Sequence, residues 1–559
     1  MNVVQDSAIV RWLLRVFACL GASCRGSVLG KAVRFCTDGS LAAQIRASAV
    51  YQFVRHCTVG GALVAWTRAS AVYRFLFKDG LGARILAAIA RCAKRSAVCD
   101  FIWRDGRLAE LWQKSVLSDV LSKLANLPGA ICTRIYEKVT PQWEGNTLLQ
   151  MSGALGGNTH AMVGLLLLVT MSIPHSKWNN MYAFVGVLAV CALFVLANVG
   201  RSGQQFNVKA LGPYVILNLA VICCSVLISQ DVWISIRFLI FQLTAFLILI
   251  LVVSSVKDYS QLRLLVTLVM VGITVAALYG CYQGIIGVEI KTGQTDMTLS
   301  LNQGMPGRIY SFFDNPNAFA GILVMAMPLT YALILNAETK YGRAAAVVSL
   351  VLCGLALVQT YSRGGWIGFA VTVVVFVLFW NWRLIPVLII VGLCCLPILP
   401  QSVINRILTI GHKGDGSTNY RMAIYGAAFR LLKKYWIQGV GLGSNVLHNT
   451  FKQFPPMYNG AYPVHTHCLY LQILAETGIL GLLTFLAAMI HQGKNAVKAC
   501  IGADSRVKLM IAAAVSGICG ILVMGLAEYV WFYTRSLYLF WFIFAVIVTG
   551  VNIARSSEG

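Results

Sequence analysis

Charged residues are scarce in this sequence. Aspartate, glutamate, lysine and arginine make up 12% of its 559 residues, about half of the share found in soluble globular proteins. Hydrophobic residues make up 58%, and the mean hydropathy is +0.73. The apolar residues come in runs of about 20, the length that a helix needs to cross a bilayer. This composition excludes a soluble globular protein and predicts an all-α, polytopic membrane protein.

Acidic residues are the rarer of the charged ones. There are 20 of them against 45 lysines and arginines, which gives a formal net charge of +25. In a membrane protein, basic residues mark cytoplasmic loops and contacts with anionic lipids, so we expect membrane lipids as partners and no nucleic acid. The first 40 residues carry five basic residues and no clear apolar core, so a secretory leader is not expected.

Motifs of several enzyme classes are also missing. The 17 cysteines are scattered, many of them within apolar runs, and show neither paired zinc spacing nor a disulfide framework. The sequence contains no Walker-type loop and no nucleophile elbow. The segments that we assign to the outer face below lack a DxD-type acidic pair, the usual metal ligand for transfer from a sugar nucleotide. We therefore expect an activity without a cofactor.

Residues 1–150 differ from the rest of the chain. They hold 20 Lys and Arg against 9 Asp and Glu, and charges interrupt their apolar stretches. Apolar residues recur at helical spacing between Val10 and Leu20, and "RASAVY" begins at both Arg46 and Arg68, which indicates duplicated amphipathic helices. We predict a basic, helical region that is cytoplasmic or lies on the membrane surface. A partner-binding module anchored by the membrane part is the alternative.

Residues 160–554 are predicted to form a twelve-span membrane domain with two long loops, 286–316 and 401–466. The predicted spans are 160–174, 179–199, 210–228, 232–255, 262–285, 317–336, 343–361, 366–380, 384–400, 468–490, 508–530 and 536–554.

The basic residues between these spans give the orientation. With a cytoplasmic N-terminus, the inner connections carry eleven lysines and arginines, whereas the short outer ones carry only Lys177, Arg363 and Arg535. The positive-inside rule then places both termini in the cytoplasm and both long loops outside.

Arginines gather on this predicted outer face. Their fixed, permanently charged donors match phosphate, and Arg363, at the mouth of a span, would hold a diphosphate at headgroup depth. As alternatives, Arg363 is an anchor that snorkels to the headgroups, and the arginines of the loops are solvated charges. Lys433 and Lys434 fit one basic face of a loop helix. The candidate substrate-contacting residues are Arg308, Asn317, Arg363, Arg421 and Arg430.

His467 is the candidate general base, because histidine ordinarily titrates near neutral pH; a bond to the helix start is the alternative role. His465 and His467 could share a metal only in an extended segment, since positions i and i+2 point about 200° apart on a helix. No Asp or Glu lies close to them in the sequence to complete a zinc site, so we expect no metal and no chemical role for His465. Glu476 is expected to bond to a neighbouring helix, and Gly478 to permit close helix packing.

Four segments resemble the O-antigen ligase and polymerase superfamily of integral membrane glycosyltransferases. His467 and Cys468 are followed, after nine residues, by "GILG" from Gly478, as in the family pattern, although the family usually has Asn, Ser or Gln in place of Cys468. The resemblance covers roughly residues 160–550. The other three segments are "DNPNAFAGIL" from Asp314, "YSRGGWIGF" from Tyr361 and "WIQGVGLGSN" from Trp436.

By position, this resemblance implies that Arg363, Arg421 and His467 are the essential groups, with Arg308 a further candidate. It implies a polyprenyl-diphosphate-linked glycan as donor and a lipid core, a growing polysaccharide or another acceptor, at the outer face of the bacterial cytoplasmic membrane. The arginines would hold the diphosphate while His467 takes a proton from the acceptor hydroxyl, without a metal. The alternative is a transporter of a small anion such as bicarbonate, for which only Arg237 and Glu476 are expected deep in the spans.

Overall fold

The computed structural model is helical in its regular parts. It describes residues 107–143, 147–200, 203–289, 299–302, 304–381, 384–395, 397, 399–410, 415–454 and 462–557. The amphipathic segment from Val10 and the repeats at Arg46 and Arg68 lie outside these residues.

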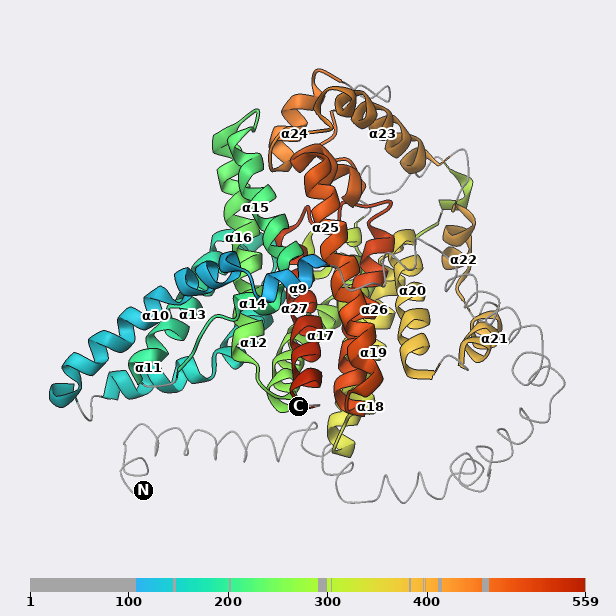
Figure 1. The fold of residues 1–559 in the computed structure, drawn as a ribbon. Helices are drawn as coiled ribbons and strands as arrows, with labels where there is room; N and C mark the ends of the chain where they lie inside the picture. Colours follow the sequence, from blue (N-terminus) through green and yellow to red (C-terminus); the bar gives the residue numbers. More distant parts are fainter. Residues whose placement is uncertain are drawn as a thin grey trace, which may run out of the picture. The chain divides into compact units, whose positions relative to one another are not determined.

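Every predicted span contains a helix (Figure 1). Four of these helices are short: α12 (Thr159–Ser172), α13 (Asn180–Leu196), α15 (Pro213–Leu227) and α21 (Ile385–Cys395). The prediction of an all-α membrane protein is confirmed, but the count of twelve spans is not. Among the described residues, eight helices are long and apolar enough to cross a membrane: α16 (Val232–Ser255), α17 (Tyr259–Ile286), α18 (Pro316–Leu335), α19 (Lys340–Gln359), α20 (Arg363–Asn381), α25 (Leu469–Gly502), α26 (Ser505–Met524) and α27 (Thr534–Ser556).

Polar caps set where several of these apolar helices begin. The side chains of Asp231, Asp258 and Thr339 accept hydrogen bonds from backbone N–H groups in the first turns of α16, α17 and α19. Asn315 does the same for α18, and Pro316 follows at its first position, where a missing N–H costs nothing. These caps satisfy donors that would otherwise be unpaired where the helix starts.

Three helices form the centre of the bundle. In α18, α26 and α27, 78%, 78% and 89% of the most apolar window is buried inside the protein, against 28% in each of α19 and α20. The exposed apolar sides of α19 and α20 are therefore left to face lipid.

The starts of α18, α20 and α25 lie at the same end of the bundle, which we call the outer end after the predicted topology. The chain must return to this end after α20, because Arg363 at the start of that helix contacts Thr409 and Asp415. Asn381 at the other end of α20 lies roughly 27 Å away. The stretch that contains α21 therefore runs back along the bundle, although its helix is short.

The predicted outer loop 401–466 is itself partly helical. It contains α22 (Gln401–Leu408), α23 (Gly416–Tyr435) and α24 (Ser444–Phe451). Figure 1 shows α23 and α24 beside the first part of α25. The described ends of the other long loop hold two short turns, η4 (Ser300–Asn302) and η5 (Ser311–Phe313).

Helix α25 is broken at Gly478, whose φ is 68° and ψ is −173°. The close approach that the sequence predicts at Gly478 is made by the segment 436–441 rather than by a helix. Glu476 accepts a 2.7 Å hydrogen bond from Gln472 of the same helix, and it also accepts one from the backbone N–H of Gly443 at the N-terminus of α24, in keeping with the bond to a neighbouring helix that we expected. The backbone bonds across the break run from Val440 N–H to the Ala475 carbonyl (2.8 Å), from Gly441 N–H to the Glu476 carbonyl (3.0 Å) and from Ile479 N–H to the Trp436 carbonyl (2.9 Å).

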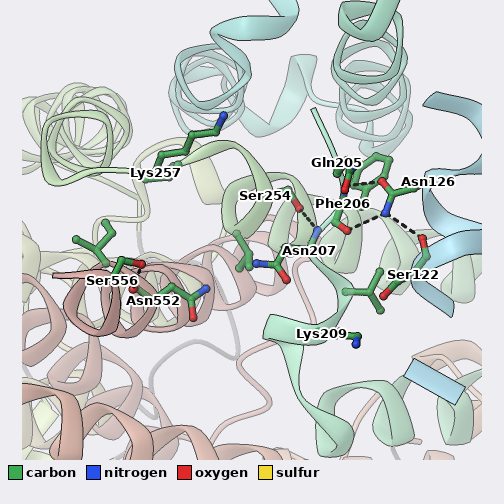
Figure 2. Close-up of a pocket in the computed structure, with 14 residues that line it drawn as sticks. Ser122, Asn126, Gln205, Phe206, Asn207, Lys209, Ser254, Lys257, Asn552 and Ser556 are labelled. Carbon is green, nitrogen blue, oxygen red and sulfur yellow. Dashed lines mark hydrogen bonds between the residues drawn. The ribbon is translucent and has the colours of Figure 1, made fainter. Parts of the chain in front are cut away.

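In the described part of the chain, α9, α10 and α11 precede the first predicted span, at the opposite, inner end. Asn126 of α10 accepts a hydrogen bond from Phe206 N–H (2.7 Å) and donates one to the Phe206 carbonyl (3.1 Å), as Figure 2 shows. Lys209 pairs with Asp119 at 2.7 Å. A cavity of about 550 Å³ lies in this joint. The bounds of the three helices are Arg107–Gln113 for α9, Val116–Trp143 for α10 and Thr147–Gly157 for α11. Phe206 and Lys209 belong to the connection that contains the short helix α14 (Val208–Leu211).

Candidate functional site

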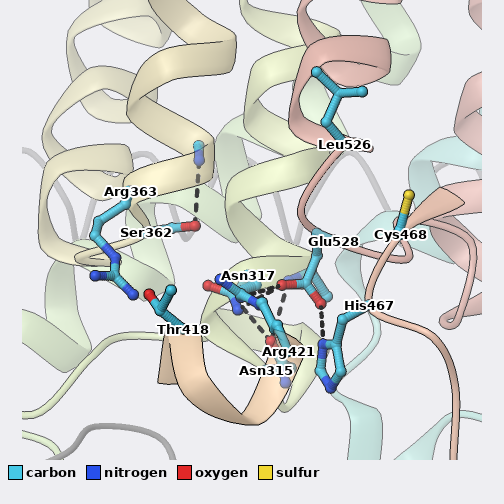
Figure 3. A network of polar contacts seen from close by, with 12 residues as sticks. Asn315, Asn317, Ser362, Arg363, Thr418, Arg421, His467, Cys468, Leu526 and Glu528 are labelled. Carbon is cyan, nitrogen blue, oxygen red and sulfur yellow. Dashed lines mark hydrogen bonds and ion pairs between the residues drawn. The ribbon is translucent and has the colours of Figure 1, made fainter. Parts of the chain in front are cut away.

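A network of polar side chains converges on Glu528 at the outer end (Figure 3). Glu528 lies in the connection between α26 and α27. Its Oε2 accepts hydrogen bonds from Asn317 Nδ2 (3.0 Å) and Arg421 Nη2 (3.1 Å), and its Oε1 lies 3.4 Å from His467 Nδ1. Asn317 is the second residue of α18, Arg421 belongs to α23, and His467 lies two residues before the start of α25. The structure thus joins three predicted residues through a carboxylate that was not predicted.

Glu528 is ionised in this network. Its side chain is 15% exposed, and burial alone would raise its pKa. The hydrogen bond and the charge of His467, followed by the charge of Arg421, outweigh burial and lower the pKa of Glu528 to about 2. An ionised carboxylate only accepts hydrogen bonds, so Nδ1 of His467 carries the hydrogen; in the neutral ring, Nε2 is then an acceptor.

Nε2 of His467 is the atom suited to accept a proton. The His467 side chain is 24% exposed, and no residue that the structure describes hydrogen-bonds Nε2. A carboxylate behind the ring fixes the tautomer and offsets the charge that the ring gains with a second proton. This geometry fits the general base expected at His467.

The backbone around the network is held in an uncommon conformation. Ser311, Asp314, Tyr361 and His467 are the non-glycine residues with positive φ in the described chain. All four lie in or beside the segments that carry the network. Such backbone persists only where its surroundings hold it, and it is frequent at functional sites.

Arg308 holds Asn317 in place. Its Nη2 donates a 2.6 Å hydrogen bond to Asn317 Oδ1, and its Nε donates to the Thr360 carbonyl at 2.8 Å. Burial, followed by the charge of Arg406, lowers the pKa of Arg308 to about 9, so the guanidinium stays charged at neutral pH. Asn317 therefore links a buried cation to Glu528.

Arg363 is paired with a carboxylate of its own. Its Nη2 lies 2.7 Å from Oδ2 of the buried Asp415, and its Nη1 donates to the Thr409 carbonyl at 3.0 Å. Asp415 also caps α23 through Thr418. Burial would raise the pKa of Asp415, but the hydrogen bonds from Thr418 and Arg363 outweigh it and lower the pKa. The pair ties the start of α20 to the start of α23.

Arg406 is a fourth arginine near the site, and sequence reasoning did not find it. It is buried, and it donates to the Tyr361 carbonyl (3.3 Å) and to Asn302 Oδ1 (3.1 Å). Burial, followed by the charge of Arg363, lowers the pKa of Arg406 to about 10. Together with Arg308, Arg363 and Arg421 this makes four arginines beside two carboxylates, so the site keeps positive charge and suits an anion.

Arg430 lies elsewhere on α23. It follows Arg421 by nine residues, which places it about 13 Å along the helix and half a turn around it. Helix geometry thus keeps Arg430 off the face on which Arg421 reaches Glu528.

His465 packs among rings. Its ring centroid lies 4.1 Å from that of His467 and 4.7 Å from that of Phe532, and its Nδ1 accepts the backbone N–H of His467 at 3.2 Å. Burial, followed by the charge of His467, lowers the pKa of His465 to about 3. The ring is therefore neutral at physiological pH.

No Asp or Glu lies close to the two histidines in the sequence, but the fold brings Glu528 beside them. One donor atom from each of His465, His467 and Glu528 lies within 4.8 Å of the others, and two histidines with a glutamate is a zinc-binding set. Arg421 already occupies Glu528, however, and its charge opposes a second cation there. The structure therefore offers three ligands to a metal ion, but the positive charge of Arg421 disfavours its binding.

The sequence did not predict Glu528 or Asp415 as site residues, for two different reasons. The sequence predicts a span over 508–530, which hides Glu528 in the membrane; α26 instead ends at Met524. Gly525 directly after the helix is the signal for this end. Asp415 has the signature of an N-cap before a polar helix, but nothing nearby in the sequence marks its pairing with Arg363.

Fold and site together define a class: an all-helical membrane protein with a cluster of arginines, carboxylates and a histidine at one end of its bundle. Residues 348–486 match the model of the O-antigen ligase family, which confirms, over these residues, the resemblance seen in the sequence. The match spans Arg363, Arg421 and His467, and it supports membrane glycosyl transfer of the O-antigen ligase type. No curated protein matches the chain.

Proposed function

We propose that this chain transfers a glycan from a polyprenyl-diphosphate donor to an acceptor hydroxyl at the outer face of the bacterial cytoplasmic membrane. The observation that carries the proposal is the orientation of His467 by Glu528 beside the arginines. The donor class follows from the family matched over residues 348–486. A site at the end of a membrane bundle suits this donor, whose polyprenyl chain lies in the bilayer and whose diphosphate lies among the headgroups.

The acceptor hydroxyl gives its proton to Nε2 of His467 while its oxygen bonds to the anomeric carbon of the donor sugar. The bond from that carbon to the diphosphate oxygen breaks, and the diphosphate leaves on its polyprenyl carrier. Arg421 uses Nη2 for Glu528, which leaves Nη1 and Nε for the leaving diphosphate. Arg363 adds positive charge where negative charge develops. No step requires a metal.

The remaining candidates have supporting roles in this proposal. Arg308 and Asn317 hold Glu528, and through it they position His467. Arg430, farther along α23, would contact the glycan or the acceptor, which is a lipid core, a growing polysaccharide or another hydroxyl compound.

The transporter alternative gains no support from the family comparison. Arg237, one of its two expected deep charges, is exposed in the second turn of α16. Glu476 is buried, and its carboxylate accepts hydrogen bonds from Gln472 of its own helix and from the backbone N–H of Gly443 at the start of α24. These bonds join α25 to α24, which is a structural use of the carboxylate.

Glycan transfer from a purified polyprenyl-diphosphate donor tests the proposal. We expect His467→Ala to lower the rate by about 10²- to 10⁴-fold, the usual contribution of a general base. His448→Ala is the matched control, since His448 lies on α24 in the same outer region and its hydrogen-bond partner is the Pro463 carbonyl, outside the network. An unchanged rate of transfer in His467→Ala would contradict the assignment of His467 as the general base.

Chelation separates the metal alternative from this mechanism. We expect the rate to be unchanged in excess EDTA. Loss of transfer in EDTA, with recovery on adding zinc, would instead assign His465, His467 and Glu528 as metal ligands.

A further inference from the structure

Helix α10 turns its polar side toward the rest of the protein. Small and polar residues at helical spacing, Ser118, Ser122, Asn126, Gly129 and Thr133, are buried or half-buried there. Ser122 and Asn126 line the cavity in the joint, together with Lys209 and Lys257 (Figure 2). The joint is thus held by hydrogen bonds and an ion pair rather than by an apolar core.

The opposite side of α10 is apolar and exposed. Its residues recur every three or four positions, so they form one stripe. At about 100° per residue, the centre of this stripe lies half a turn from the centre of the docked polar side. The stripe consists of Leu117, Val120, Leu124, Leu127, Ile131 and Ile135, which are 44% to 60% exposed.

This arrangement is the reverse of that in a water-soluble protein, where the apolar stripe of a surface helix faces the core. The neighbouring helices indicate what covers the apolar stripe of α10. Met151 and Leu155 of α11 and Val185 of α13 are also exposed apolar residues, at 54%, 43% and 60%, and α10 packs against α13. The stripe therefore continues a surface that reaches the lipid-facing side of a predicted span.

Basic side chains border the stripe along one edge. Lys123, Arg134 and Lys138 lie on the same side of its centre, within about 90° of it, and are exposed. A helix with an apolar stripe edged by lysine and arginine is suited to the plane of a membrane surface that carries negative charge.

We propose that α10 lies in the bilayer surface at the inner end, with its apolar stripe in the acyl chains and its basic edge on anionic phospholipid headgroups. Under the predicted topology this surface is the inner leaflet. The helix is then clamped between lipid on one side and the protein on the other, so residues 107–143 form part of the membrane-embedded structure.

Photo-crosslinking of the full chain tests this placement. Benzoylphenylalanine is introduced at Leu124, and the protein is illuminated in vesicles that contain equal amounts of phosphatidylglycerol and phosphatidylcholine. We expect phospholipid adducts by mass spectrometry, in several-fold higher yield than from the same group at Ala130, which is exposed but lies off the stripe. Ile131 serves as a second position should the Leu124 variant not fold.

The adducts should be enriched in phosphatidylglycerol. Replacing Lys123, Arg134 and Lys138 by Gln should remove this enrichment and leave total lipid adducts unchanged. Crosslinks from Leu124 and Ile131 to residues 1–106, to a second copy or to another protein, in place of lipid, would overturn the proposal. Equal adducts with both lipids in the unaltered chain would overturn its anionic part.

Discussion

At the scale of single residues, the site depends on Glu528 for the orientation of His467. Glu528→Gln keeps the shape of the side chain but removes the charge that holds Nδ1–H of His467. We expect transfer to fall by about 10²- to 10⁴-fold, because the ring then takes the wrong tautomer in part of the molecules. A fall in kcat with a changed pH profile, at unaltered KM for the donor, identifies positioning. An unchanged rate would mean that His467 does not need Glu528.

The same substitution has a pH-dependent effect on stability. The pKa of Glu528 is about 2 in the folded protein, below its ordinary value of 4.5. A lowered folded-state pKa stabilises the fold above about pH 4.5, and this contribution is lost as the pH falls toward 2. The difference in Tm between the unaltered chain and Glu528→Gln should thus be largest near neutrality and shrink in acid. Glu338→Gln, at an exposed ion pair with Arg263, should show no comparable trend.

At the scale of elements, the break in α25 at Gly478 provides the place where segment 436–441 of the outer loop packs against the helix. A Cβ at Gly478 would lie 2.0 Å from the Ile437 carbonyl oxygen, and the positive φ disfavours any other residue. We expect Gly478→Ala to lower the free energy of unfolding by at least about 1 to 3 kcal/mol, seen as a lower Tm. Gly493→Ala is the matched control in the same helix, since nothing lies within 4 Å of its Cβ position. If both variants have the same Tm, the packing of segment 436–441 against the break does not contribute to stability.

The helices of this protein were largely predictable, because each apolar run carries its own signal of length and composition. The ends were less so. Gly478 has the sequence pattern of a glycine at a helix–helix contact, but the segment 436–441 packs against it instead of a helix. The break in α25 is recognised only from the positive φ of Gly478. The end of α26 had a local marker in Gly525, yet apolar residues continue to Tyr529 and extend the predicted span over Glu528.

At the scale of the whole molecule, the pairings within the site could not be predicted. Asn317 and Glu528 are 211 residues apart, and Arg421 and Glu528 are 107 apart. Residue type and predicted topology indicated which arginines and which histidine belong to the outer end. Which carboxylate each one meets depends on the packing of α18, α23 and α26, and no local pattern encodes that packing.

The orientation in the membrane follows from basic residues and not from packing, so it needs a test of its own. Lys434 is exposed at the end of α23 and Lys340 at the start of α19, on opposite ends of the bundle. With the outer end outside, an impermeant thiol reagent should modify Lys434→Cys in intact cells and Lys340→Cys only after permeabilisation. Peptide mapping distinguishes each introduced thiol from the native cysteines. The reverse pattern would place Glu528 and His467 in the cytoplasm, where a donor displayed on the outer face could not reach them, and the proposed reaction would fail with the topology.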